Sequence, residues 1–197
     1  MLEMLNTVAA IGTFVVIAAT AIAAVFQLRH LRAANQLEGL LTVLARVEDS
    51  NFNSWLTDTQ QQLPHLLSDP DYVRSVINNS FDRSVAWLQL GNSYDWVGNL
   101  VKNKLIPEPA FLDVYSFRVV QAWELMIPVT LLARFNTTDG IWENFEFLYM
   151  RALAWADSHP NGAYPKHMAR CTLPPIETAL PAVAHVLREN SAPKQAS

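Results

Sequence analysis

Residues 7–26 read TVAAIGTFVVIAATAIAAVF, and the basic stretch QLRHLR follows at residues 27–32. The first stretch holds twenty residues without a charged side chain. A helix of this length rises about 30 Å, which is the thickness of the hydrocarbon core of a bilayer. The stretch contains no proline, and an uninterrupted helix satisfies its own backbone hydrogen bonds, as the bilayer requires. The sequence therefore predicts an N-terminal transmembrane anchor over residues 1–27.

Two other kinds of segment give a similar pattern. A buried helix of a soluble protein usually carries a polar stripe, and no such stripe precedes Gln27. A cleaved signal peptide normally begins with basic residues, whereas residues 1–6 carry only Glu3 as a charged side chain. The triplet Ala21-Ile22-Ala23 does resemble a cleavage site. A signal anchor that stays in the membrane is favoured over both alternatives.

The flanking charges predict the orientation of this anchor. Arg29, Arg32 and Arg46 follow the apolar stretch, and no Lys or Arg precedes it. Because positive charge is retained on the cytoplasmic side, we expect the N-terminus outside and the rest of the chain in the cytoplasm. Gly12, Ala19 and Ala23 lie at helical spacings of seven and four on the anchor. Small side chains let helices approach closely in lipid, so these three are candidates for helix packing in the membrane.

Charge and composition narrow the class of partner. The chain is 51% hydrophobic and only 16% charged. Between residues 28 and 157 there are ten Lys and Arg against fifteen Asp and Glu. A nucleic-acid-binding protein needs a basic face to neutralise phosphates, so we expect no nucleic-acid partner. The single cysteine, Cys171, has no other cysteine in the chain to pair with.

The remaining pattern is helical throughout. Apolar residues recur every three or four positions, and no alternation typical of strands persists. The expected helices are a continuation of the anchor to about residue 48, a helix over 52–67, a long helix from Ser68-Asp69-Pro70 to about 101, one over 110–135 that Pro128 should kink, and one over 141–156. The predicted fold is all-α, with the transmembrane helix continuing into a cytoplasmic bundle of about four to five helices over residues 28–157. A Pro- and Ala-rich tail follows over residues 158–197.

Four segments carry a resemblance to known proteins: FQLRHLRAANQL at 26–37, NLVKNKLIPEPAF at 99–111, Ala122-Trp123-Glu124, and IWENFEFL at 141–148. Together they resemble a loosely defined group of small bacterial single-span membrane proteins, which have an N-terminal anchor and a cytoplasmic all-helical domain of unknown function. The resemblance covers residues 7–157. It implies a location in the bacterial inner membrane, and it supplies no reaction, cofactor or catalytic residue.

The carboxylates and histidines form no recognised catalytic or metal-binding motif. Glu143 and Glu146 lie three apart, with Glu124 on the preceding helix, but two-metal bundle sites use Glu-x-x-His pairs and this sequence has none. His167 and Cys171 lie four apart, in the same tail as His159 and His185, yet this tail is proline-rich and lacks the paired spacing of zinc sites. A Cys171–His65 nucleophile pair lacks any family signature. The six glycines form no phosphate-binding loop. We therefore expect no metal, cofactor or catalytic residue.

Six tryptophans are the most unusual feature of the body. Trp123 and Trp142 lie on apolar stripes and are expected in the core. Trp55 and Trp96 lie beside polar neighbours and are candidates for a partner interface, where tryptophan is enriched.

The expected function is a non-enzymatic, membrane-tethered interaction protein. It would be an accessory or scaffolding subunit of a membrane complex, docking on another protein or on its own copies. The alternative is a membrane-anchored sensor or small-molecule-binding module. Its pocket between helices would be lined by Arg118, Gln121 and Glu124.

Overall fold

The computed structural model describes residues 1–175, with all their side chains except those of Leu5 and Val8. Two compact units divide the chain, Met1–Gly162 and Ala163–Ser197. Residues 176–197 of the predicted tail, including His185, lie outside the described residues.

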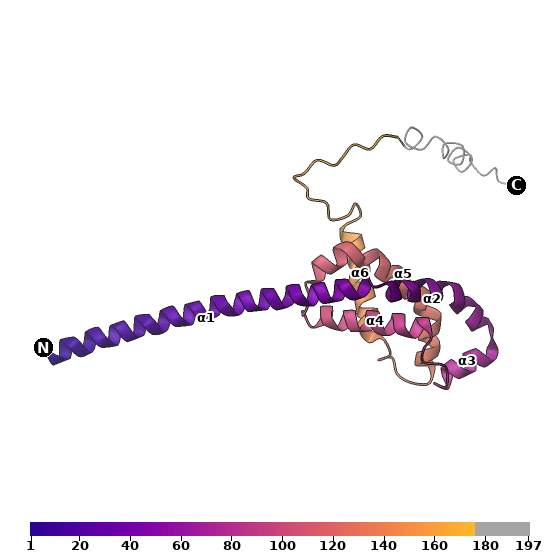
Figure 1. Ribbon diagram of the computed structural model, residues 1–197, viewed down its shortest axis with the longest axis horizontal. Coiled ribbons are helices and arrows are strands. Elements are labelled where there is room, and N and C mark those ends of the chain that lie inside the picture. Colours follow the sequence, from indigo (N-terminus) through magenta and orange to yellow (C-terminus); the bar gives the residue numbers. More distant parts are fainter. Residues whose placement is uncertain (176–197) are drawn as a thin grey trace. The chain divides into compact units, whose positions relative to one another are not determined.

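All secondary structure in the described residues is helical, which confirms the predicted all-α fold. Figure 1 labels the helices in chain order, and all of them belong to the first unit. They are α1 (Leu2–Val47), α2 (Ser50–Ser68), α3 (Pro70–Ile77), α4 (Ala86–Lys102), α5 (Glu108–Phe135) and α6 (Glu143–Ser158).

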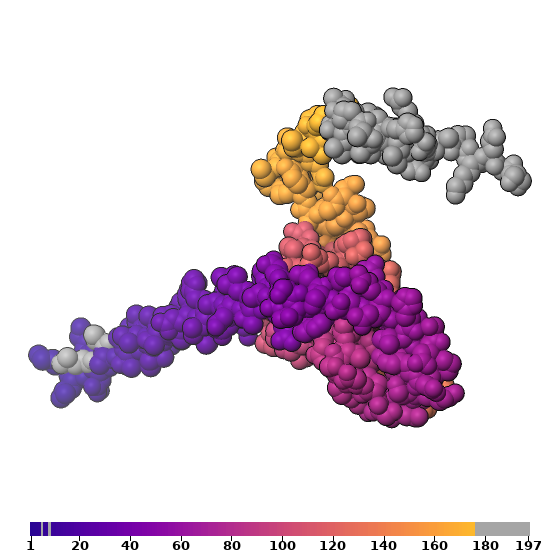
Figure 2. Space-filling model, turned by 45° about the vertical axis from the view of Figure 1, so that its right-hand side comes forward, coloured from indigo at the N-terminus to yellow at the C-terminus, as the bar shows by residue number. Residues whose placement is uncertain are grey.

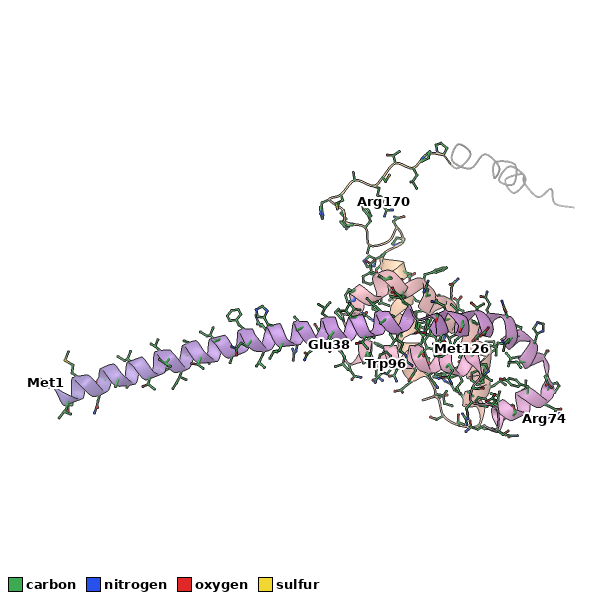
Figure 3. The ribbon with its side chains drawn as sticks, viewed as in Figure 1. Met1, Glu38, Arg74, Trp96, Met126 and Arg170 are labelled. Carbon is green, nitrogen blue, oxygen red and sulfur yellow. The ribbon has the colours of Figure 1, made fainter. Side chains whose placement is uncertain are left out.

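Helix α1 is one continuous helix of 46 residues. Its side chains are exposed from Leu2 to Asn35, apart from the half-buried Ala18 and the two that are not described. Packing begins at the next turn, where Gln36 donates a hydrogen bond to the Lys104 carbonyl at 3.3 Å. Figure 1 shows the N-terminal part of α1 extending away from the other helices of its unit, and Figure 2 shows the same in space-filling form. In Figure 3, Glu38 marks the place where α1 reaches the bundle.

The end of α1 and the start of α2 form as the sequence predicts. After Val47, the Asp49 side chain accepts the N–H of Asn51 at 2.7 Å and caps α2. Such capping satisfies a backbone donor that has no partner inside the helix. Val43 and Val47 are buried, so the last two turns of α1 are part of the bundle core.

The prediction of one long helix from residue 70 to about 101 is wrong, because the chain forms two helices there. Helix α3 ends at Ile77, and Asn79 takes a left-handed conformation with φ of 57°. The Asp82 side chain then accepts the N–H of Ser84 at 2.9 Å. Short polar side chains that bond nearby backbone groups favour turns over helix interiors. Asn78, Asn79, Ser80 and Asp82 together therefore override the apolar periodicity of this segment.

Tyr94 of α4 lies at the centre of the core. Its ring stacks on Phe145 of α6, with 4.7 Å between centroids, and it meets the edge of Phe52 of α2 at 5.1 Å. Trp123 of α5 also contacts Phe145 in an edge-to-face arrangement, with 5.0 Å between centroids. Aromatic contacts of this kind contribute beyond the apolar area they bury. One aromatic cluster therefore joins four helices into a single core.

Candidate functional site

The start of α6 is held by a stripe of residues on α4. The Asp95 carboxylate accepts the backbone N–H groups of Asn144 at 3.0 Å and Phe145 at 3.2 Å. Its other oxygen accepts the Asn144 side-chain amide at 3.2 Å. These N–H groups belong to the first turn of α6, where no backbone partner exists within the helix. The residue preceding α6, Trp142, makes no side-chain cap of its own, so Asp95 supplies the cap from another helix.

Two glycines on the same stripe allow this close approach. A Cβ at Gly98 would lie 2.0 Å from the Asn144 carbonyl oxygen, and one at Gly91 would lie 2.6 Å from the Trp142 ring. The indole of Trp142 donates a hydrogen bond to Asn92 at 3.0 Å. The segment containing WENF thus has a packing role, because its backbone and its indole are both received by α4.

The carboxylates considered for metal binding are engaged elsewhere or exposed. Glu143 pairs with Lys102 at 3.2 Å, and Glu146 pairs with Arg134 at 2.7 Å. Glu124 is exposed on α5. His167 and Cys171 are exposed in the second unit. Among the described residues, no three His, Cys, Asp or Glu side chains gather as a metal ion would require.

The two tryptophans proposed for a partner interface are half-buried against the core. The Arg46 guanidinium lies over the Trp96 ring, 5.4 Å from its centroid. Trp96 is labelled in Figure 3. Arg46 also lines a surface hollow of about 220 Å³ with Trp55, Phe52, Asp49 and Asn51. Arg46, at the end of α1, therefore lies over the Trp96 ring and lines the same hollow as Trp55, at the junction of α1 and α2.

The residues proposed to line a pocket lie elsewhere than expected. Arg118, Gln121 and Glu124 are all exposed on the outer side of α5. They do not line a cavity between the helices of one chain, because helix α5 turns its other side to the core. The apolar spacing of this helix predicts a core stripe through Leu112, Tyr115, Val119, Trp123 and Ile127, but Ile127 is 39% exposed. The outer side of α5 also carries Val114, Phe117, Leu131 and Phe135, all of them exposed.

Sequence reasoning missed this second apolar side of α5. The predicted core stripe is buried at Leu112, Tyr115, Val119 and Trp123. A second series at alternating steps of three and four runs along the same helix from Val114 to Phe135. A helix that is apolar on two sides buries one of them in the core of its bundle. The second series was therefore the signal in the sequence for an exposed apolar side of α5.

The proposed helix-packing residues of the anchor, Gly12, Ala19 and Ala23, are exposed on α1. Nothing lies within 4 Å of a Cβ built on Gly12. The Thr13 and Thr20 hydroxyls each bond to the carbonyl four residues earlier, at 2.9 Å and 2.7 Å. The apolar part of α1 is long enough to cross a membrane, and none of its most apolar window is buried.

Two core tyrosines have perturbed acidity. Burial raises the pKa of Tyr94 above its usual value, and its hydroxyl lies 3.5 Å from the Arg118 carbonyl. Burial also raises the pKa of Tyr115, and a hydrogen bond of 3.0 Å from its hydroxyl to the Glu48 carboxylate acts in the same direction. Both phenols are thus held neutral, and the second ties the end of α1 to α5.

Comparison with known protein families matches residues 14–152 to a domain of unknown function, DUF4760. The chain belongs to the DUF4760 family. The DUF4760 match begins inside the apolar segment of α1 and ends in α6. It therefore includes both the exposed apolar helix and the bundle. No curated protein and no solved structure matches this DUF4760 chain.

Proposed function

We propose that this protein is a membrane-tethered interaction protein that has no catalytic centre of its own. It serves as an accessory or scaffolding subunit of a membrane complex. The observation that carries the proposal is the apolar segment of α1, of which none of the most apolar window is buried. Leaving such a surface in water is unfavourable by about 25 cal/mol per Å². A bilayer removes that cost.

The family match supports a retained anchor over a cleaved leader. The matched region starts at residue 14, within the apolar segment. A leader removed by a peptidase is discarded from the mature protein, whereas this segment is continuous with a helix that packs in the bundle through Val43 and Val47. The arginines that follow the segment favour a cytoplasmic body. By resemblance, the membrane is the bacterial inner membrane.

The interaction part of the proposal rests on the outer side of α5. Val114, Phe117, Leu131 and Phe135 are exposed there in addition to a complete buried stripe. Large exposed apolar patches on a folded domain mark interaction sites. The junction of α1 and α2, where Arg46 lies over Trp96 and lines a hollow with Trp55, is a second and smaller candidate.

Fractionation tests the tether directly. The full chain should remain in the membrane pellet after alkaline carbonate washing, whereas a variant lacking residues 1–27 should appear in the soluble fraction and keep its helical circular dichroism. A full chain released by carbonate would contradict the proposal. So would a truncated body that stays with purified, protein-free vesicles.

The assembly is tested by extracting the tagged chain in mild nonionic detergent, followed by sizing and mass spectrometry. A stoichiometric larger assembly, either with another protein or of several copies, supports the accessory or scaffolding role. A monodisperse single copy at cellular concentration contradicts it.

The sensor alternative has less support. Ligand pockets usually enclose about 300–1,000 Å³, and the hollow beside Trp55 measures about 220 Å³. The three residues expected to line a pocket are on the surface.

A further inference from the structure

The outer α5 face comprises the exposed residues Val114, Phe117, Gln121, Glu124, Pro128, Leu131 and Phe135. Its four large apolar members are 64%, 71%, 65% and 74% exposed, in the order Val114, Phe117, Leu131, Phe135. The apolar members lie toward the two ends of the helix, while Gln121 and Glu124 occupy the middle.

The spacing of this face is that of a helix–helix seam. Successive members are separated by alternating steps of three and four residues. Such an alternation keeps one line of side chains facing a partner helix along its whole length. A polar residue within such a seam specifies register and orientation at some cost in stability.

We propose that this face pairs with the same face of a second copy of the chain, with the two α5 helices antiparallel about a two-fold axis. In this register Val114 packs on Leu131 of the second copy, and Phe117 packs on its Pro128. Gln121 lies opposite Glu124 of the second copy, so a side-chain amide can donate to a carboxylate. Two-fold interfaces are self-complementary in this way, each contact occurring twice.

Charge favours the antiparallel orientation. A parallel pair would place Glu124 against Glu124, and like charges at close range repel. In the antiparallel pair, Arg118 comes within one helical turn of Glu124 of the second copy. Arg118 and Glu124 are both exposed, and neither forms an ion pair within the part of the chain that the structure describes. The pairing gives each of them an opposite charge.

The area of the face fits a dimer with a small interface. Since an aromatic side chain presents about 150–250 Å², the apolar members expose on the order of 600 Å² per copy. Two copies would bury at most about 1,200 Å², the lower end of specific interfaces. An interface of this size needs a raised local concentration, which tethering supplies. The inference thus rests on the proposed function.

A lipid surface would suit the face less well. Helices that lie on membranes carry Lys and Arg around their apolar side. Here Glu124 lies in the middle of the face and Asp113 lies exposed beside Val114.

The test uses the full chain in native membranes with Cys171→Ser, so that each added cysteine is the only one in its copy. Val114→Cys and Leu131→Cys are made on copies bearing different tags and treated with a short bis-maleimide. In the antiparallel pair these two cysteines are opposite, whereas each lies about 25 Å from its own counterpart. Met150→Cys, 57% exposed on α6, is the matched control.

The expected result is a cross-link between the two tags when the variants are co-expressed, with neither variant cross-linking to itself above the Met150→Cys level. Adding Phe117→Asp should lower the cross-linked fraction about tenfold, as loss of a large apolar anchor does. Self-cross-linking of each variant alone would show a parallel pair and overturn the proposal. Cross-linking no higher than the control would also overturn it. In that case, quenching of a fluorophore on Val114→Cys by spin-labelled lipid would assign the face to the bilayer.

Failure of the inference and failure of the proposed function are separable in the same preparation. A chain that stays in carbonate-washed membranes without cross-linking supports the proposed tether and contradicts the proposed pairing. A chain found in the soluble fraction loses the tether. The pairing is then scored on the purified chain at a concentration of about 1 mM, which a short tether would have supplied.

Discussion

The carboxylate of Asp95 on α4 accepts the backbone N–H of Asn144 at 3.0 Å and so caps a helix to which it does not belong. A cap usually comes from the residue just before the helix. Here the α4–α6 contact and the start of α6 are one interaction, because the same carboxylate also bonds the N–H of Phe145. Removing it should loosen both at once.

Asp95→Ala should lower the free energy of unfolding by about 2 kcal/mol, since two helix N–H groups lose a charged acceptor. Thermal unfolding of the full chain in nonionic detergent, followed by circular dichroism, measures this change. Asp113→Ala, at an exposed carboxylate on α5, is the control and should change stability by less than about 0.5 kcal/mol. Equal effects of the two variants would show that Asp95 acts only through charge.

Gly98→Ala adds only one methyl group, but it should lower the free energy of unfolding by about 3 kcal/mol or more. The added Cβ would meet the Asn144 carbonyl oxygen at 2.0 Å, and backbone atoms cannot move aside as a side chain can. Gly140→Ala is the control, because its nearest neighbours are Thr138 side-chain atoms at ordinary contact distance. A fully stable Gly98→Ala chain would contradict the close α4–α6 contact.

Thr59→Val should stabilise the protein by about 1 kcal/mol. The Thr59 hydroxyl is buried and has no hydrogen-bond partner among the described residues. Burying a hydroxyl without a partner is costly, and valine has the same shape without that cost. The matched variant is Thr130→Val, because the Thr130 hydroxyl is equally buried but bonds the Met126 carbonyl at 2.8 Å. It should be neutral or destabilising, so the two substitutions should differ in sign when measured by the same unfolding curve.

Stability should fall as pH rises above about 10. The pKa of Tyr94 and that of Tyr115 are both raised in the folded state, so the unfolded chain loses these protons first. Their contribution is complete below pH 10 and is lost progressively above it, and the slope for Tyr94 approaches about 1.4 kcal/mol per pH unit. Unfolding measured between pH 8 and 11 reports the slope.

Two phenylalanine variants test this assignment. Tyr94→Phe should flatten the alkaline decline with little change at pH 8, because its hydroxyl makes only a 3.5 Å contact. Tyr115→Phe should flatten it as well, but should also cost about 1 kcal/mol at pH 8 through loss of the Glu48 bond. An unchanged slope in Tyr94→Phe would contradict the assignment.

The helical fold could be predicted from sequence because its signals are local. The apolar steps through Leu112, Tyr115 and Val119 identify the buried side of α5, and Pro109 marks its first turn. The break after Ile77 was missed because the apolar spacing through Phe81 and Val85 continues across it. There, hydrogen bonds of short polar side chains outweigh periodicity.

The contacts between helices could not be predicted in the same way. From the sequence, Asp95 looks like an ordinary surface carboxylate, because the residues around it do not indicate that Asn144 will lie beside it. Gly91 and Gly98 likewise have a role only once α6 is placed on α4. The outer α5 face was available in the sequence but was hidden by a stronger stripe on the same helix, and Arg118, Gln121 and Glu124 were assigned to the wrong side.

The side chains of α1 between Gln27 and Asn35 are exposed, and this part of the helix is a spacer between the apolar segment and the bundle. It holds the bundle about 14 Å beyond the apolar segment, without any loop that could absorb a change in length. One inserted residue would raise the bundle by about 1.5 Å and also turn it by about 100°. An insertion of seven residues restores the azimuth to within about 20°, and four residues offset it by about 40°. The height of the bundle and its rotation about the α1 axis are therefore coupled, and both are set by the number of residues between the apolar segment and the bundle.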